Sequence, residues 1–185
     1  MRLKKTLEDN PVVAAVKDYK QLEKALESDI NVIFVLFGDI LNIADISQKI
    51  KKSGKVGILH IDLVEGLSSK EVSIRYLKEN TVFDGIISTK PQSIRVAKKL
   101  GLFAIQRFFI IDSISLKNIK VHLVEECDAV EILPGLIYKI IKELSDTIKK
   151  PLIVGGLISD KEDVMSALNS GATCISTTKE SIWEM

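Results

Sequence analysis

The sequence has few cysteines, no long hydrophobic run and no excess of charge of either sign. Its two cysteines, Cys127 and Cys174, are isolated and belong to no paired motif, so we expect no disulfide scaffold and a reducing, cytoplasmic environment. No apolar run approaches the roughly 18 residues that indicate a membrane span. The charges after Met1 precede no apolar segment of the kind that a signal peptide contains. The sequence therefore predicts a cytoplasmic protein with no membrane partner.

The charges nearly cancel, because 26 Lys and Arg residues face 25 Asp and Glu residues, for a formal net charge of +1. This balance argues against a polycation held on nucleic acid by bulk electrostatics. Hydrophobic residues make up 46% of the chain and charged residues 28%, which excludes disorder and collagen-like repeats. The length of 185 residues predicts one domain over residues 1–185, with residues 1–10 as an N-terminal extension.

Short apolar runs alternate with longer amphipathic segments along the whole chain. The runs are typical of parallel strands buried on both faces and cover residues 12–16, 31–37, 56–61, 84–88, 102–110, 128–133, 151–154 and 172–176. The segments between them predict helices over residues 19–28, 43–53, 69–79, 92–100, 114–125, 136–149 and 161–170. Asp18, Ser68 and Asp160 are placed to cap three of these helices.

Eight strands that alternate with helices can form a doubly wound sheet or a closed barrel. A doubly wound sheet usually has a glycine-rich turn after its first strand, and here Lys17, Asp18 and Tyr19 follow that strand instead. Each strand–helix unit averages about 23 residues, which is short for a barrel of this type. We therefore expect a compact (β/α)₈ TIM-type barrel with short helices, and a truncated last helix over residues 179–185.

The loops after the last two strands predict a phosphate site. Active sites of such barrels lie at the carboxyl ends of the strands, where glycines let backbone N–H groups reach phosphate oxygens and hydroxyls add donors. The alternative is that the glycines only form a tight turn and the hydroxyls only cap a helix. The candidate phosphate-binding residues are Gly155, Gly156, Ser176, Thr177 and Thr178.

Other polar residues follow the remaining strands at the same predicted end. His60 and Asp62 are two residues apart on one expected strand, so their side chains would point to the same side. They could act as an acid–base pair, form part of a metal site, or recognise a ligand hydroxyl. Lys90 follows the fourth expected strand, where a lysine can form a Schiff base with a substrate or contribute a positive charge to the binding of an anionic ligand. Arg107 fits a carboxylate or phosphate, or an ion pair with Glu131 or Asp112.

Seven blocks of the sequence resemble the glycerol uptake operon antiterminator regulatory protein family, in the family's order and over about residues 11 to 183. They are His60–Leu67, Asp84–Lys90, Ile105–Phe109, Asp112-Ser113, Glu131–Gly135, Gly155–Ile158 and Ser176–Thr178. The resemblance implies a compact barrel that senses glycerol 3-phosphate and binds the leader of a glycerol-operon messenger RNA. Binding there would prevent premature termination of transcription.

The leading interpretation is therefore a regulator without catalytic residues, metal or cofactor, whose effector is glycerol 3-phosphate. The phosphate would lie on the two final loops, and His60, Asp62, Lys90, Arg107 and Glu131 would surround the glycerol end. Leader RNA would bind a lysine cluster, for which the candidates are Lys49, Lys51, Lys52 and Lys55. A homodimer is one assembly that fits this interpretation.

Two other functions remain open at this point. One is an enzyme, such as a lyase or isomerase, that acts on a small phosphorylated metabolite through His60, Asp62 or Lys90. The other is a metabolite-binding barrel that works through a protein partner. Turnover of a phosphorylated substrate would select the enzyme, and ligand-dependent retention of leader RNA would select the regulator.

Overall fold

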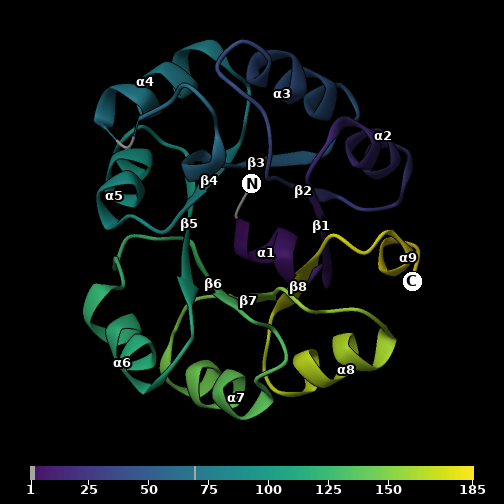
Figure 1. The fold of residues 1–185 in the computed structure, drawn as a ribbon, viewed down its shortest axis with the longest axis vertical. Helices are drawn as coiled ribbons and strands as arrows, with labels where there is room; N and C mark the ends of the chain where they lie inside the picture. The colour runs from purple at the N-terminus through teal and green to yellow at the C-terminus, as the bar shows by residue number, and fades with distance from the viewer. Residues whose placement is uncertain (1–2, 69) are drawn as a thin grey trace.

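Eight parallel strands close into a barrel in the computed structural model, which describes residues 3–68 and 70–185. Each strand pairs with its neighbours in sequence, and β8 pairs with β1 to close the ring (Figure 1). The strands are β1 Val12–Val16, β2 Val32–Val35, β3 Val56–His60, β4 Gly85–Ser88, β5 Phe103–Phe109, β6 Ala129–Leu133, β7 Leu152–Gly155 and β8 Cys174–Thr177. The predicted TIM-type barrel is confirmed, and the doubly wound sheet is excluded.

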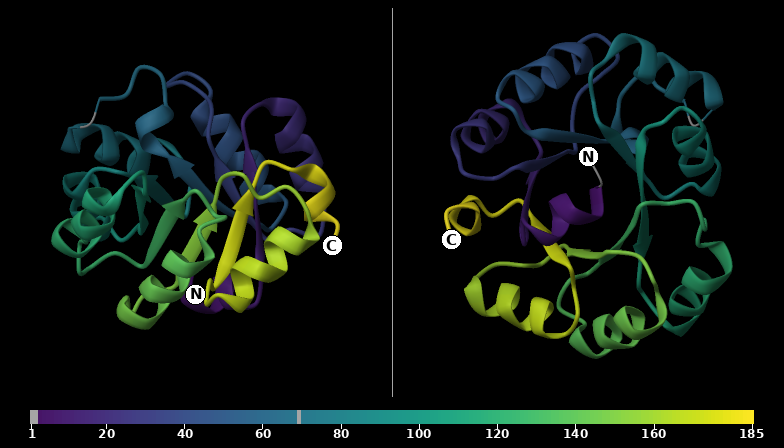
Figure 2. Two further views of the ribbon diagram at one scale, coloured as in Figure 1. Left: turned by 60° about the horizontal axis from the view of Figure 1, so that its bottom comes forward. Right: turned by 180° about the vertical axis from the view of Figure 1, so that it is seen from behind.

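The helices form a ring around the strands, as both face views show (Figures 1 and 2). They are α2 Tyr19–Glu27, α3 Ile43–Lys52, α4 Glu71–Asn80, α5 Pro91–Lys99, α6 Ser113–His122, α7 Tyr138–Thr147 and α8 Lys161–Asn169. The last helix, α9 Glu180–Trp183, has four residues, as the predicted truncation requires. Its Trp183 is buried and donates its indole N–H to the carbonyl oxygen of Thr177 at 3.0 Å, which fixes α9 against the barrel.

Two separate apolar clusters fill the molecule. Along each strand, alternate residues belong to one cluster or the other, because successive side chains of a strand point to opposite faces. On β3, Val56 and Ile58 join the smaller cluster inside the barrel, while Leu59 joins the larger cluster beneath the helices. By the same alternation, His60 at the end of β3 faces the barrel interior.

A short helix closes one end of the barrel. Helix α1, Leu3–Glu8, lies within the segment expected as an extension, and its buried Leu3 and Leu7 join the interior cluster. The helix lies across the barrel opening in Figure 1, at the end from which the strand arrows start in Figure 2. The spacing of four residues places both leucines on one helix face. The predicted extension is therefore in part a structural plug.

The helix caps agree with the sequence at two of three positions. Asp18 and Asp160 accept hydrogen bonds from the backbone N–H groups of Gln21 and Asp163, at 2.8 and 2.9 Å. Ser68 is not a cap: α4 begins at Glu71, so Lys70 occupies the cap position and the Ser68 hydroxyl lies 3.1 Å from that of Ser73. Residue 69, where we expected this helix to begin, lies outside the described residues.

Within residues 3–68 and 70–185, no helix has the length and apolar character that crossing a membrane requires.

We expect Leu7→Ala to lower the free energy of unfolding by about 2–5 kcal/mol, because it leaves a cavity under a fully buried leucine. Lys5→Ala, on the exposed face of the same helix, should change it by less than about 0.5 kcal/mol. Urea denaturation of both variants measures the difference. Equal effects would show that α1 does not seal the barrel.

Candidate functional site

The loops after β7 and β8 enclose a pocket of about 140 Å³ at the carboxyl end of the barrel. It lies opposite the end that α1 closes. Both polar and apolar side chains line it, and the sequence gives no reason to assign the apolar ones a function. The lining residues are Ala15, Leu36, Arg107, Glu131, Leu133, Gly156, Leu157, Ile158, Ser176, Thr177 and Thr178. The structure therefore brings together four of the five predicted phosphate residues, with Gly155 directly beside them in the chain.

A buried ion pair forms one wall of this pocket. Arg107 donates from Nε to Oε2 of Glu131 at 2.7 Å, and both side chains are buried. The other oxygen of Glu131 accepts from the hydroxyl of Ser176, also at 2.7 Å. Of the two partners considered for Arg107, Glu131 is thus the one observed. Within the described part of the chain, the terminal guanidinium nitrogens of Arg107 have no partner and remain available at the pocket.

Gly155 is required by the close approach of this network. A Cβ atom at Gly155 would lie 2.3 Å from the hydroxyl oxygen of Ser176 and 3.2 Å from Oε1 of Glu131. The next two residues, Gly156 and Leu157, both have positive φ, at 75° and 63°. A left-handed conformation is ordinary for glycine but rare for leucine. The loop therefore has a specific, partly strained shape at the pocket.

The three hydroxyls of the last loop differ in whether they still have a proton to donate to a ligand. Ser176 donates to Glu131, and Thr177 donates to the carbonyl oxygen of Ile158 at 3.0 Å. Thr177 also accepts from the backbone N–H of Lys179 at 3.1 Å. Lys179 is the N-cap residue of α9 and no described side chain caps this helix, so the helix-capping alternative is not observed for Thr177. A hydroxyl has one proton to donate, so only Thr178 keeps a hydroxyl proton for a ligand. The backbone N–H groups of Gly156, Leu157 and Thr178 have no protein acceptor within the described residues.

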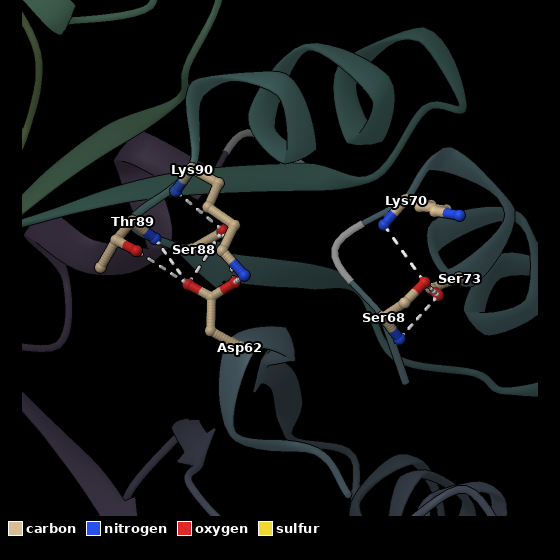
Figure 3. A network of polar contacts seen from close by, with 7 residues as sticks. All are labelled: Asp62, Ser68, Lys70, Ser73, Ser88, Thr89 and Lys90. Carbon is tan, nitrogen blue, oxygen red and sulfur yellow. Dashed lines mark hydrogen bonds and ion pairs between the residues drawn. The ribbon is translucent and has the colours of Figure 1, made fainter. Parts of the chain in front are cut away.

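A second polar network lies across the barrel mouth, between β3 and β4 (Figure 3). The carboxylate of Asp62 accepts from the Ser88 hydroxyl at 3.0 Å and from the backbone N–H of Thr89 at 2.8 Å. Lys90 lies 3.6 Å from the same carboxylate, with its side chain about half exposed. Asp62 thus holds the loop after β4 and orients the Lys90 ammonium.

The prediction that His60 and Asp62 lie on one strand is wrong. Strand β3 ends at His60, and Asp62 belongs to the 3₁₀ turn Ile61–Leu63. A turn does not keep the two-residue alternation of a strand. His60 therefore faces the interior, while Asp62 faces the loop of β4.

His60 is buried, and its Nδ1 has no hydrogen-bond partner within the described residues. Burial first, and then the neighbouring charge of Arg107, lower the pKa of His60 to about 4. Lys90 acts in the same direction, whereas Asp62 opposes it. The imidazole is therefore neutral at physiological pH.

The described residues contain no group of three His, Cys, Asp or Glu side chains arranged to hold a metal ion. Cys127 and Cys174 are buried free thiols whose pKa values burial raises. A thiol with a raised pKa is a poor nucleophile and metal ligand.

Comparison with known proteins assigns the chain to a family. A family model described as glycerol-3-phosphate responsive antiterminator matches residues 12–183. The chain belongs to this family. The protein YgcP of Escherichia coli (strain K12) is 45% identical over 186 residues, which cover 100% of this chain and 97% of YgcP.

Two solved structures of antiterminator proteins share the whole fold. The glycerol uptake operon antiterminator regulatory protein of Listeria monocytogenes is 32% identical, with a TM-score of 0.90 over 94% of both chains. An antiterminator-related protein of Thermotoga maritima is 31% identical, with a TM-score of 0.82 over 95% of this chain and 99% of the other. Several aldolases also match at 11–13% identity, which shows the fold alone.

The lysines considered for RNA lie at the other end of the barrel, where α3 ends and β3 begins. Lys49 and Lys51 form ion pairs with Glu23 and Asp84, at 2.5 and 2.9 Å. Lys55 donates to two backbone carbonyls at 2.6 Å, and burial lowers its pKa. This member of the antiterminator family therefore keeps its candidate RNA lysines and its pocket at opposite ends.

We expect His60 to make the protein less stable in acid. The pKa of His60 is about 4 in the folded state and about 6.5 in the unfolded state, so between these values only the unfolded state binds the proton. Stability should fall as pH falls from 6.5 to 4.5, by about 2–3 kcal/mol from this residue. The measurement is urea denaturation at pH 7 and 4.5 for the wild type and His60→Gln. The same acid-induced loss in both proteins would contradict the assignment.

Proposed function

We propose that the protein is a regulator that binds glycerol 3-phosphate at the barrel mouth and leader messenger RNA in response. Membership of the glycerol-3-phosphate responsive antiterminator family supports the effector and the regulatory class. The observation that carries the proposal is the pocket between the loops of β7 and β8, where several unused donors converge.

The phosphate would take its hydrogen bonds from groups that the protein leaves unpaired. These are the N–H groups of Gly156, Leu157 and Thr178, together with the Thr178 hydroxyl and the terminal nitrogens of Arg107. A guanidinium pairs well with phosphate oxygens, and a glycine-containing loop lets the backbone approach them. Ser176 and Gly155 would act through Glu131, by keeping Arg107 in place.

The glycerol end would extend from this pocket toward the second polar network. The Lys90 ammonium is half exposed there, and the Nδ1 atom of the buried His60 has no partner within the described residues. Asp62 and Glu131 have their oxygens occupied by protein donors, so their role would be to orient Lys90 and Arg107.

We expect glycerol 3-phosphate to stabilise the protein and glycerol to do so far less, since most of the unused donors address a phosphate. At about 100 times its Kd, the effector should add roughly 2.7 kcal/mol, or a rise in Tm of roughly 5–11 °C. Thermal unfolding with each ligand measures the shift. An equal shift with glycerol would refute the phosphate pocket.

Gly156→Asp should abolish this shift, because it places a carboxylate at the phosphate position. Gly101→Asp is the matched control: Gly101 has φ 73°, against 75° for Gly156, and a side chain there meets open space. Both variants carry the same backbone strain and the same charge, and only Gly156 lines the pocket. A full shift in Gly156→Asp would show that the effector binds elsewhere.

RNA binding should depend on the effector and only modestly on salt. With a net charge of +1, contacts must come from local lysines, and three to five phosphate contacts give a slope of log K against log salt of roughly −2 to −3.5. A coupling of about 1–3 kcal/mol would raise RNA affinity about 5- to 150-fold when effector is present. Filter binding of leader RNA across a salt series, with and without glycerol 3-phosphate, tests both. Equal binding with and without effector would contradict the sensor.

The RNA surface is tested by changing Lys49, Lys51 and Lys52 together to glutamine. Lys55 is left intact because its bonds to the carbonyls of Ser28 and Ile30 support the fold. The control changes three exposed lysines of α6 and α7, Lys117, Lys139 and Lys142, to glutamine. A selective loss of RNA affinity in the first variant supports this surface, and an equal loss in both would refute it.

We expect no turnover of glycerol 3-phosphate or related phosphosugars. The Ser176 hydroxyl donates to a carboxylate that Arg107 already neutralises, and the Lys90 ammonium is half exposed beside Asp62. Neither arrangement provides an activated nucleophile. Product analysis after prolonged incubation is the measurement, and an activity that His60→Ala or Lys90→Ala removes would favour the enzyme.

A further inference from the structure

We propose that His60 determines specificity by recognising a hydroxyl group of the ligand, so that the site selects hydroxylated phosphate monoesters over unsubstituted ones. This inference rests on the proposed function, because it assigns the second half of the same ligand site.

The first support is where the ring lies. His60 is the last residue of β3 and faces the interior, above Ile58 in the same alternating row. It lies close enough to Arg107 and Lys90 for both charges to act on it. Arg107 lines the phosphate pocket, and Lys90 belongs to the network of Asp62. A ligand that extends from Arg107 toward Lys90 would pass this ring.

The second support is that the ring is buried and that its Nδ1 has no hydrogen-bond partner. His60 is 4% exposed, and its Nδ1 has no hydrogen-bond partner within residues 3–68 and 70–185. Nearly all buried polar groups in proteins have a partner, because an unpaired one loses its bond to water without replacement. The neighbouring carboxylate of Asp62 does not supply one, since it accepts from Ser88 and Thr89 instead. The missing partner is one that the ligand can bring.

The third support is the match between a neutral imidazole and a hydroxyl. A neutral ring has one donor and one acceptor nitrogen, and a hydroxyl likewise donates and accepts. A phosphate dianion only accepts, and its donors are already found on the loops of β7 and β8. A site built to bond a hydroxyl rejects an analogue without it, because the buried polar group then stays unpaired.

The test compares glycerol 3-phosphate with propyl phosphate, which has the same carbon chain without the hydroxyls. Calorimetric titration should show that the wild type binds propyl phosphate roughly 5- to 150-fold more weakly. In His60→Phe this ratio should fall to within about threefold of unity, while binding of inorganic phosphate persists. His122→Phe is the control, because His122 is the other histidine and lies exposed on α6, and it should keep the wild-type ratio.

The outcomes separate the two levels of the proposal. If the wild type binds no glycerol 3-phosphate, the proposed function fails. If it binds but His60→Phe keeps the wild-type ratio, the role of His60 is overturned. Should His60→Phe fail to fold, His60→Asn and His60→Ala replace it. The amide of asparagine should retain most of the selectivity and alanine should lose it, and equal ratios in these two variants would also overturn the inference.

Discussion

The buried carboxylate of Glu131 is the group on which the barrel mouth depends. It is fully removed from solvent, and an isolated charge there would be strongly destabilising unless cations and donors surround it. Arg107 from β5 and Ser176 from β8 meet this need at 2.7 Å each. Gly155 on β7 leaves the space for them. One carboxylate thereby links β5, β6 and β8, with β7 leaving room between them, and the pocket takes its shape from that arrangement.

The interior side chains are apolar at one end of the barrel and polar at the other, although the strands alternate in the same way throughout. At the end where the strands start, the interior is apolar and Leu3 and Leu7 of α1 cover it. At the other end the interior positions become His60, Arg107, Glu131 and Ser176. Covering the first end with a helix leaves the second as the open mouth, so polar groups on the inner wall gather at one face. This division makes the mouth the place of the proposed binding site.

Most of the candidate site could be predicted because it follows from strand order. Parallel strands end at the same face, so Gly156, Ser176 and Thr178 had to come close together once the barrel was recognised. The roles of individual side chains could not be predicted in this way. Ser176 and Thr177 are similar hydroxyl residues in the sequence, yet Ser176 donates to Glu131 and Thr177 donates to the carbonyl oxygen of Ile158. Hydrogen bonds between segments far apart in the chain decide such roles, and the spacing of residues along the sequence does not predict these bonds.

The sequence by itself determined the barrel, the short helices and the face that carries the polar residues, because hydrophobic periodicity and helix caps are local signals. Only the tertiary structure decided that α1 closes the interior, that Asp62 leaves the strand after His60, and that Leu157 adopts a left-handed conformation beside Gly156. Each of these depends on contacts between segments far apart in the chain. A buried group takes whichever partner the closed barrel brings within reach, and that choice is made by packing in three dimensions.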